Sequence, residues 1–224
     1  MSSHQSQIAN RESKIHRPSL LWNIGRTLCR ILTSKYFDLK VYHTHHIPRT
    51  GGVLLISNHQ SYLDPILLGV QVTRPMSYLA RHTLFRNRLF SWLITNLNAF
   101  PVRRGEGDVG AVKEAIRRLE DGRMLAMFPE GTRSTTGEIE SLEPGIALVI
   151  RRARDLTVIP AAIDGSFRAW PKGQKLPRGH PIRLMYGPPL DVADLRSAQI
   201  ISKLDQTLKQ MLTDLRSGNI NKYK

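Results

Sequence analysis

The segment "LLISNHQSYLDPILLG", residues 54 to 69, contains an apolar run, a polar break and a second apolar run. The first run follows a glycine pair and is typical of a buried strand. Asp64 and Pro65 predict that a helix begins there, because Asp is a good N-cap and Pro is favoured in the first helical turn. The segment therefore predicts a strand, a polar turn over residues 58 to 63, and a helix.

Alternating strand and helix patterns continue along the chain. Predicted helices cover residues 64–72, 82–100, 108–122, 144–154 and 191–218, and predicted strands cover 38–48 (ending in a turn), 51–57, 76–80, 123–129, 156–164 and 181–187. Such alternation is typical of sheets on which helices pack. The sequence therefore predicts an α/β fold, with a largely parallel mixed sheet flanked by helices on both faces and an N-terminal amphipathic helix.

The 224 residues suit one α/β domain with a sizeable core. They include 33 Lys and Arg against 18 Asp and Glu, a formal net charge of +15. This surplus indicates an anionic partner, which could be nucleic acid, an anionic membrane surface or a phosphorylated substrate. The single cysteine, Cys29, excludes an intramolecular disulfide and a zinc cluster built from cysteines, and is typical of a reducing compartment.

The sequence shows neither a membrane-crossing segment nor, at its N-terminus, the basic-then-apolar order of a secretory signal. Residues 1–17 are polar and are expected to form a flexible tail, and a second polar tail is expected at 217–224. The uncharged segment 89–102 is shorter than the roughly 18 apolar residues that a spanning helix needs, and it holds two Asn. We therefore expect no transmembrane helix.

Residues 18–36 predict an amphipathic helix. At about 100° per residue, its apolar side chains share one arc and most polar ones share the other. The apolar arc contains Leu20, Leu21, Trp22, Ile24, Leu28, Cys29, Ile31 and Leu32. Two interpretations are open: the helix packs on the core through this arc, or it lies in a lipid interface, which suits Trp, Leu and Arg.

The polar turn after the first buried strand holds His59 and, five residues later, Asp64. In sheets of this kind the reacting groups usually lie in loops beyond the carboxyl ends of strands. On a continuous helix these two side chains would point about 140° apart, so they can meet only across a turn. A carboxylate on one imidazole nitrogen fixes the tautomer and makes the other nitrogen a better proton acceptor. Such a pair is a general base for a hydroxyl or a thiol.

Two other interpretations of this turn are open. Asp64 could serve only as the helix N-cap, with His59 a loop residue whose hydrogen bonds are satisfied. A Ser-His-Asp hydrolase would use Ser57 or Ser61 as its nucleophile, but neither serine has the glycine-flanked setting of a nucleophile elbow.

A second polar cluster, "FPEGTRS" at 128–134, directly follows a predicted strand. Gly131 permits a tight turn, Thr132 and Ser134 supply hydroxyls, and Arg133 offers a planar fork suited to phosphate oxygens. The alternative is a polar turn in which Glu130 and Arg133 form an ion pair.

Two further clusters are less specific. Arg103 and Arg104, before "GEGD", extend the cationic reach of the chain unless they are solvated surface charges. The histidine cluster "HTHH" at 43–46 has no companion ligands, so we expect a turn at the end of a strand there, and we expect no metal site in the chain.

Four blocks occur in a fixed order: "NHQSYLD" at 58–64, "PVRRGEGD" at 101–108, "FPEGTRS" at 128–134 and "VIPAAI" at 158–163. Together they resemble the four ordered motifs of the glycerolipid acyltransferases, and most of all the bacterial 1-acylglycerol-3-phosphate acyltransferases. The likeness covers roughly residues 37 to 190, and we expect an acyltransferase domain over 37–216.

The resemblance implies roles for individual residues. His59 is implied as the general base and Asp64 as its orienting partner. In two places the chain departs from the family pattern: Arg103 stands where the family often has Asp, and Glu143 stands where many relatives have Lys. The residues implied for substrate binding are Asn58, Ser61, Arg103, Arg104, Glu130, Gly131, Thr132, Arg133 and Pro160, the last in the block linked with the acyl donor.

The implied reaction transfers a fatty acyl group from acyl-CoA or acyl carrier protein to the free hydroxyl of lysophosphatidic acid, giving phosphatidic acid in phospholipid biosynthesis. It requires no cofactor besides the donor. The resemblance also favours lipid contact for residues 18–36, makes 84–100 a second candidate, and implies a peripheral or monotopic enzyme on the cytoplasmic face of the cell membrane, bound to its anionic surface.

Two alternatives remain for the function. The acceptor could be another lysophospholipid or an aminolipid. From a different class, a non-catalytic basic protein could bind nucleic acid, but sparse aromatic residues and the lack of a nucleic-acid motif argue against this. We therefore expect no nucleic-acid partner.

Overall fold

The apolar run after the glycine pair forms β2 (Gly52–Ser57), a strand in which all six residues are buried. The computed structural model describes residues 20–102 and 108–223, and β2 is the middle strand of a seven-stranded sheet. The sheet order is β1-β7-β6-β2-β5-β3-β4. The other strands are β1 (Lys40–Tyr42), β3 (Met76–Arg81), β4 (Ala99–Val102), β5 (Met124–Met127), β6 (Leu156–Asp164) and β7 (Arg183–Tyr186).

All neighbouring strands run parallel except β6 and β7, which are antiparallel. The predicted mixed, largely parallel sheet is confirmed. The register pairs Ile56 of β2 with Met127 of β5 and with Pro160 of β6. The loops that follow β2 and β5 therefore leave the sheet side by side.

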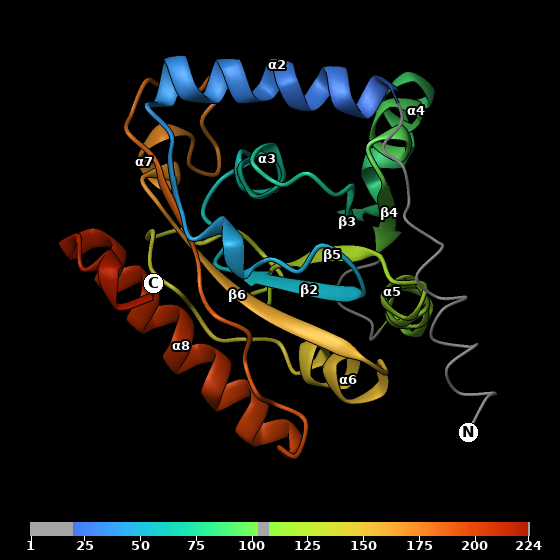
Figure 1. Cartoon of the computed structure of the whole chain (residues 1–224). Coiled ribbons are helices and arrows are strands. Elements are labelled where there is room, and N and C mark those ends of the chain that lie inside the picture. The colour runs from blue at the N-terminus through green and yellow to red at the C-terminus, as the bar shows by residue number, and fades with distance from the viewer. Residues whose placement is uncertain (1–19, 103–107, 224) are drawn as a thin grey trace.

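Helices cover both faces of the sheet (Figure 1). They are α2 (Leu20–Phe37), α3 (Asp64–Val70), α4 (Arg88–Asn96), α5 (Val109–Glu120), α6 (Gly145–Arg152), α7 (Ser166–Ala169) and α8 (Ser197–Ser217), with short 3-10 helices η1 (Thr44–His46), η2 (His82–Phe85) and η3 (Ile220–Tyr223). Because strand side chains alternate between faces, Val53 and Leu55 of β2 pack in the core under α3, while Leu54 and Ile56 pack against α5, α6 and α8. The expected two-faced α/β architecture is thus confirmed.

The helix α2 turns its apolar arc away from the protein. Among its described side chains, Trp22, Thr33 and Phe37 are buried, and the helix lies across α3. Leu20, Ile24, Leu28, Ile31 and Leu32 are all exposed, between 48% and 76%. The interpretation in which the helix packs on the core through this arc is therefore wrong, although one predicted member of the arc, Trp22, is buried.

The segment expected as one helix over residues 82–100 is divided instead. It contains η2, then α4, whose Asn87 N-cap accepts a 3.0 Å hydrogen bond from the backbone of Phe90, and it ends in β4. An apolar run with few charges fits a helix or a buried strand equally well, which explains the error. Pro101 is tolerated in β4 because this strand lies at the edge of the sheet.

Two features of the described chain bear on the predicted ends and on the membrane. Within residues 20–102 and 108–223, no helix has both the length and the apolarity needed to cross a bilayer. In the predicted C-terminal tail, η3 lies against α8, where the hydroxyl of Tyr223 donates a 2.8 Å hydrogen bond to Asp214. The predicted tail at 1–17 lies outside the described residues.

Candidate active site

The turn after β2 brings Asp64 and His59 together. One carboxylate oxygen, Oδ2 of Asp64, accepts hydrogen bonds from His59 Nδ1 at 2.9 Å and from the backbone amides of Gln60 and Ser61 at 2.6 and 2.7 Å. Asp64 is fully buried. Three donors on one buried oxygen suit an ionised carboxylate, because hydrogen bonds to a charged acceptor are the stronger kind.

Asp64 does not cap the helix that follows. The helix α3 begins at Asp64 itself, with Leu63 in the N-cap position and no side-chain cap bond, while Pro65 lies in the first turn. The N-cap prediction for Asp64 is therefore wrong, because its carboxylate points back into the turn. The interpretation of Asp64 as only a helix cap fails with it.

The imidazole of His59 is held on two sides. Its ring stacks on Phe128 with 4.0 Å between centroids and 18° between planes, and Nδ1 lies against Asp64. The Asp64 carboxylate beside Nδ1 holds the ring proton on that nitrogen and leaves Nε2 with a lone pair. Among the described residues, Nε2 has no hydrogen-bond partner. The geometry is that of a fixed general base with only 8% of the residue exposed.

The backbone of His59 is tied to the loop after β5 by two hydrogen bonds. Its amide donates to Oε1 of Glu130 at 2.7 Å, and its carbonyl accepts from the amide of Ser134 at 2.7 Å. The other oxygen of Glu130 accepts from the amide of Glu140. Burial raises the pKa of the Glu130 carboxyl to about 7, although these two amide hydrogen bonds act in the opposite direction.

Asn58 and Ser61 are buried, and their side chains are engaged inside the protein. The amide of Asn58 makes a double hydrogen bond with the backbone of Ile163 in β6, at 2.8 and 2.9 Å. The hydroxyl of Ser61 donates to the carbonyl of Trp170 and accepts from the amide of Leu63. These contacts fix the turn, so neither side chain is presented to a substrate.

The loop after β5 carries the cluster predicted to bind phosphate. Gly131 has φ +65°, a left-handed conformation that favours glycine, and Thr132 is exposed. The guanidinium carbon of Arg133 lies 3.4 Å from the ring centroid of Tyr62, and its Nη1 is buried without a hydrogen-bond partner among the described residues. The alternative ion pair between Glu130 and Arg133 is absent from the described interactions.

The remaining predicted residues lie apart from this cluster or outside the described chain. Pro160 is buried in β6, and its carbonyl accepts a 2.8 Å hydrogen bond from Gly187, where an added Cβ would lie 2.9 Å from the proline ring. Pro160 is therefore closely packed within the sheet. Arg103 and Arg104 lie outside the described residues.

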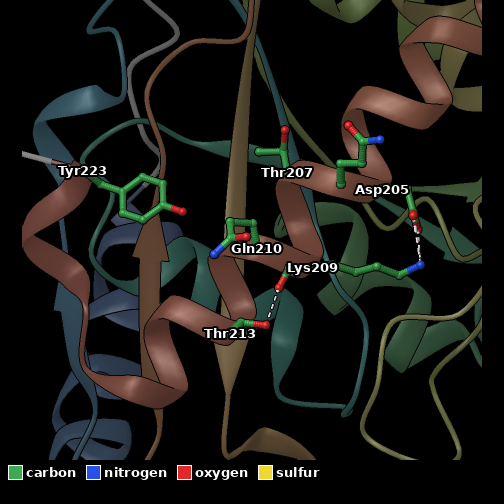
Figure 2. A pocket seen from close by; sticks show the side chains of 7 residues that line it. Asp205, Thr207, Lys209, Gln210, Thr213 and Tyr223 are labelled. Atoms are coloured by element: carbon green, nitrogen blue, oxygen red, sulfur yellow. Dashed lines mark hydrogen bonds and ion pairs between the residues drawn. The ribbon is translucent and has the colours of Figure 1, made fainter.

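A hollow of about 710 Å³ lies beside α8 and η3, and it contains none of the predicted site residues. In Figure 2 its polar side chains interact with their own neighbours: Lys209 pairs with Asp205 at 2.8 Å, and Thr213 donates to the carbonyl of Lys209. Within the described part of the chain, no group of three His, Cys, Asp or Glu residues is placed to hold a metal ion.

Several contacts that hold the site were not predicted from the sequence. Phe128 stacks on His59, and its position follows from the register, because it succeeds Met127 as Ser57 succeeds Ile56 on the neighbouring strand. That signal requires the strand order, which the sequence pattern does not contain. Ile163, Trp170 and Tyr62 were likewise missed as partners of the turn. Ser134 was singled out for its hydroxyl, and not for the backbone amide that bonds to His59.

Comparison with known proteins identifies the class. The family model described as Acyltransferase matches residues 38–164, so the chain belongs to the acyltransferase family. It is an enzyme of the transferase class.

The most informative relatives are bacterial. The 1-acyl-sn-glycerol-3-phosphate acyltransferase of Bacillus subtilis (strain 168) is 28% identical over 190 residues, covering 83% of this chain and 92% of the relative. The protein of the same name from Streptococcus pneumoniae (strain ATCC BAA-255 / R6) is 29% identical over 160 residues, covering 69% of this chain and 57% of its own length. The crystal structure of the 1-acyl-sn-glycerophosphate acyltransferase PlsC from Thermotoga maritima superposes with a TM-score of 0.76 at 21% identity, covering 95% of this chain and 88% of that one; this likeness concerns the fold alone.

Proposed function

We propose that this acyltransferase transfers a fatty acyl group to the free hydroxyl of lysophosphatidic acid, giving phosphatidic acid. The observation that carries the proposal is the pair of backbone hydrogen bonds that ties His59 to the loop bearing Arg133. A base and a phosphate-binding side chain thereby share one site. The names of the Bacillus and Streptococcus relatives support the same acceptor. The donor is acyl-CoA or acyl carrier protein.

In the proposed mechanism Nε2 of His59 takes the proton of the acceptor hydroxyl as the hydroxyl oxygen attacks the thioester carbonyl. The carbon–sulfur bond then breaks, and the departing thiolate takes the proton back from Nε2. Asp64 keeps the ring oriented and stabilises the imidazolium that forms in between. The reaction needs no covalent enzyme intermediate and no cofactor besides the donor.

The acceptor phosphate is assigned to the loop after β5. Arg133 offers planar N–H donors that suit a phosphate, and its buried Nη1 has no acceptor among the described residues, so it can donate to a phosphate oxygen. Thr132 is exposed on the same loop. Arg104 is assigned to the same phosphate by family resemblance, and Arg103, which departs from the family pattern, adds positive charge next to it in the sequence. Asn58, Ser61 and Glu130 are assigned a positioning role instead of substrate contact, because their polar atoms are engaged within the protein.

The enzyme is proposed to bind an anionic membrane surface peripherally, on the cytoplasmic side. The support is a set of exposed apolar side chains on α2, on α4 and on the loop after α7. Figure 1 shows that α2, α4 and α7 lie on one side of the sheet. The exposed side chains on α4 and on that loop are Leu89, Phe90, Trp92, Leu93 and Leu176. Exposed apolar patches beside basic side chains suit a lipid interface. The net charge of +15 is proposed to attract anionic lipid and the acceptor phosphate, and not nucleic acid.

An acceptor panel tests the proposal. The purified chain is given lysophosphatidic acid, a lysophospholipid with a larger head group, or an aminolipid, each with acyl-CoA and with acyl carrier protein as donor. We expect the highest kcat/KM with lysophosphatidic acid, with at least one of the two donors. Faster transfer to either other acceptor would overturn the acceptor assignment while leaving the acyltransferase class intact.

A further inference from the structure

Tyr62 lies in the turn that joins His59 to Asp64, but its side chain points out of the core. The residue is 49% exposed, whereas its neighbours Ser61 and Leu63 are buried. Its ring faces the guanidinium of Arg133 at 3.4 Å and lies 5.2 Å from the ring of Trp170. The base-bearing turn therefore contacts the phosphate-binding loop through an aromatic ring as well as through the backbone.

The position of this ring is set by the turn itself. The hydroxyl of Ser61 bonds to the carbonyl of Trp170 and to the amide of Leu63, so the chain on both sides of Tyr62 is held. Trp170 is held in turn, since its indole N–H donates to the carbonyl of Gln174 at 2.9 Å. Because its backbone is held and Trp170 packs beside it, the Tyr62 ring keeps one orientation in which a cation can lie against its face.

When the face of the Arg133 guanidinium lies against the Tyr62 ring, the N–H groups at its edge can still donate hydrogen bonds. The guanidinium carbon of Arg133 lies only 3.4 Å from the ring centroid, a distance that leaves room only for contact through the flat face of the group, while its N–H donors lie in the plane of that group. Nη1 of Arg133 is buried and has no acceptor among the described residues. The contact with Tyr62 therefore leaves at least these N–H donors unpaired. An oxyanion needs those edge donors, and holding the face in advance reduces the side-chain freedom lost on binding.

We propose that Tyr62 is a positioning residue that orients Arg133 for the phosphate of the acceptor. The proposal rests on the proposed function, in which Arg133 binds that phosphate. It acts on the binding of the acceptor and leaves the proton transfer at His59 untouched. The ring face carries the effect, so the phenolic hydroxyl is dispensable.

The test measures KM and kcat for a short-chain lysophosphatidic acid, kept below its aggregation concentration, at saturating donor. We expect Tyr62→Leu to raise KM about threefold to tenfold with kcat nearly unchanged, as suits the loss of one cation–π contact. Tyr62→Phe and Tyr62→Trp keep the ring and should retain the low KM. Tyr223→Leu is the matched control, because Tyr223 also faces a cation, Lys222, but lies at the C-terminal end beside α8.

A double-mutant cycle separates this proposal from the proposed function. Arg133→Ala should raise KM strongly, and Tyr62→Leu should add no further increase in that background. If Arg133→Ala leaves KM for lysophosphatidic acid unchanged, the phosphate assignment in the proposed function is wrong. If Arg133→Ala raises KM but Tyr62→Leu does not, or if Tyr62→Phe is as impaired as Tyr62→Leu, only the positioning role of Tyr62 is overturned.

Discussion

The carboxylate of Glu130 accepts a 2.7 Å hydrogen bond from the backbone amide of His59. Its second oxygen accepts from the amide of Glu140, so a single buried side chain links three segments of the site. Glu130 belongs to the cluster that the sequence assigns to phosphate binding. Both of its oxygens already hold backbone groups in place, which favours a positioning role over direct contact with phosphate.

Glu130→Ala should therefore impair the position of His59. The change leaves a buried amide without its acceptor, which costs about 1–3 kcal/mol in the free energy of unfolding. We expect a lower kcat with a smaller change in the KM of the acceptor, measured by steady-state kinetics and urea unfolding. Glu140→Ala is the control, since its side chain is exposed; an equal loss of kcat in both variants would contradict the positioning role.

The raised pKa of Glu130, about 7, predicts a pH-dependent stability. A carboxyl whose pKa is higher in the folded state stabilises the fold at low pH and loses this contribution as the pH rises through the folded-state value. From pH 5 to pH 8 the free energy of unfolding of the wild type should fall relative to that of Glu130→Gln. Unfolding curves at several pH values measure this difference, and a difference that stays constant would rule out the raised pKa.

Asn58 should be needed for stability as well as for activity. Asn58→Ala removes both hydrogen bonds to Ile163, and the loss of two partners for buried backbone groups costs about 2 to 4 kcal/mol. The turn that carries His59 would then lose its anchor on β6. Thermal unfolding and acyl transfer measure the two effects; Asn58→Ala with wild-type stability would contradict the anchoring role.

The exposed arc of α2 should bind lipid. The triple change Ile24→Ser, Leu28→Ser and Ile31→Ser removes side chains that each contribute up to about 1.5–3 kcal/mol when fully buried in an apolar medium, so binding to anionic vesicles should weaken at least about tenfold. The melting temperature should change little, because these side chains are exposed. Val109→Ser, at another exposed apolar residue, is the control, and unchanged co-sedimentation of the triple variant would count against the lipid surface.

Much of the fold follows from local pattern. The alternation of strands and helices depends on near neighbours in the sequence and was predicted correctly. The helix expected from residue 108 likewise begins where Asp108, its N-cap, accepts a 3.0 Å hydrogen bond from Ala111. The strand order was not predicted, because it depends on contacts between distant segments. The same limit explains why Phe128 was missed as the surface against which His59 stacks.

In the site, too, some features follow from local sequence and others depend on contacts between distant segments. The meeting of His59 and Asp64 follows from the helix start, because a helix that begins at residue 64 leaves the residues between it and the preceding strand free to turn. The direction of the Asp64 side chain did not follow, since capping and catalysis use the same residue type at the same place. For α2, periodicity identified the apolar arc, but only the packing of Thr33 and Phe37 shows which side faces the protein.

The measurement that tests the central claim most directly is acyl transfer to lysophosphatidic acid by His59→Ala, with far-UV circular dichroism and thermal unfolding as checks of the fold. A general base contributes about 10²–10⁴-fold to the rate, so we predict a loss of kcat of that size in a variant that is folded like the wild type. A folded His59→Ala variant that transfers acyl groups at a near-normal rate would contradict the account.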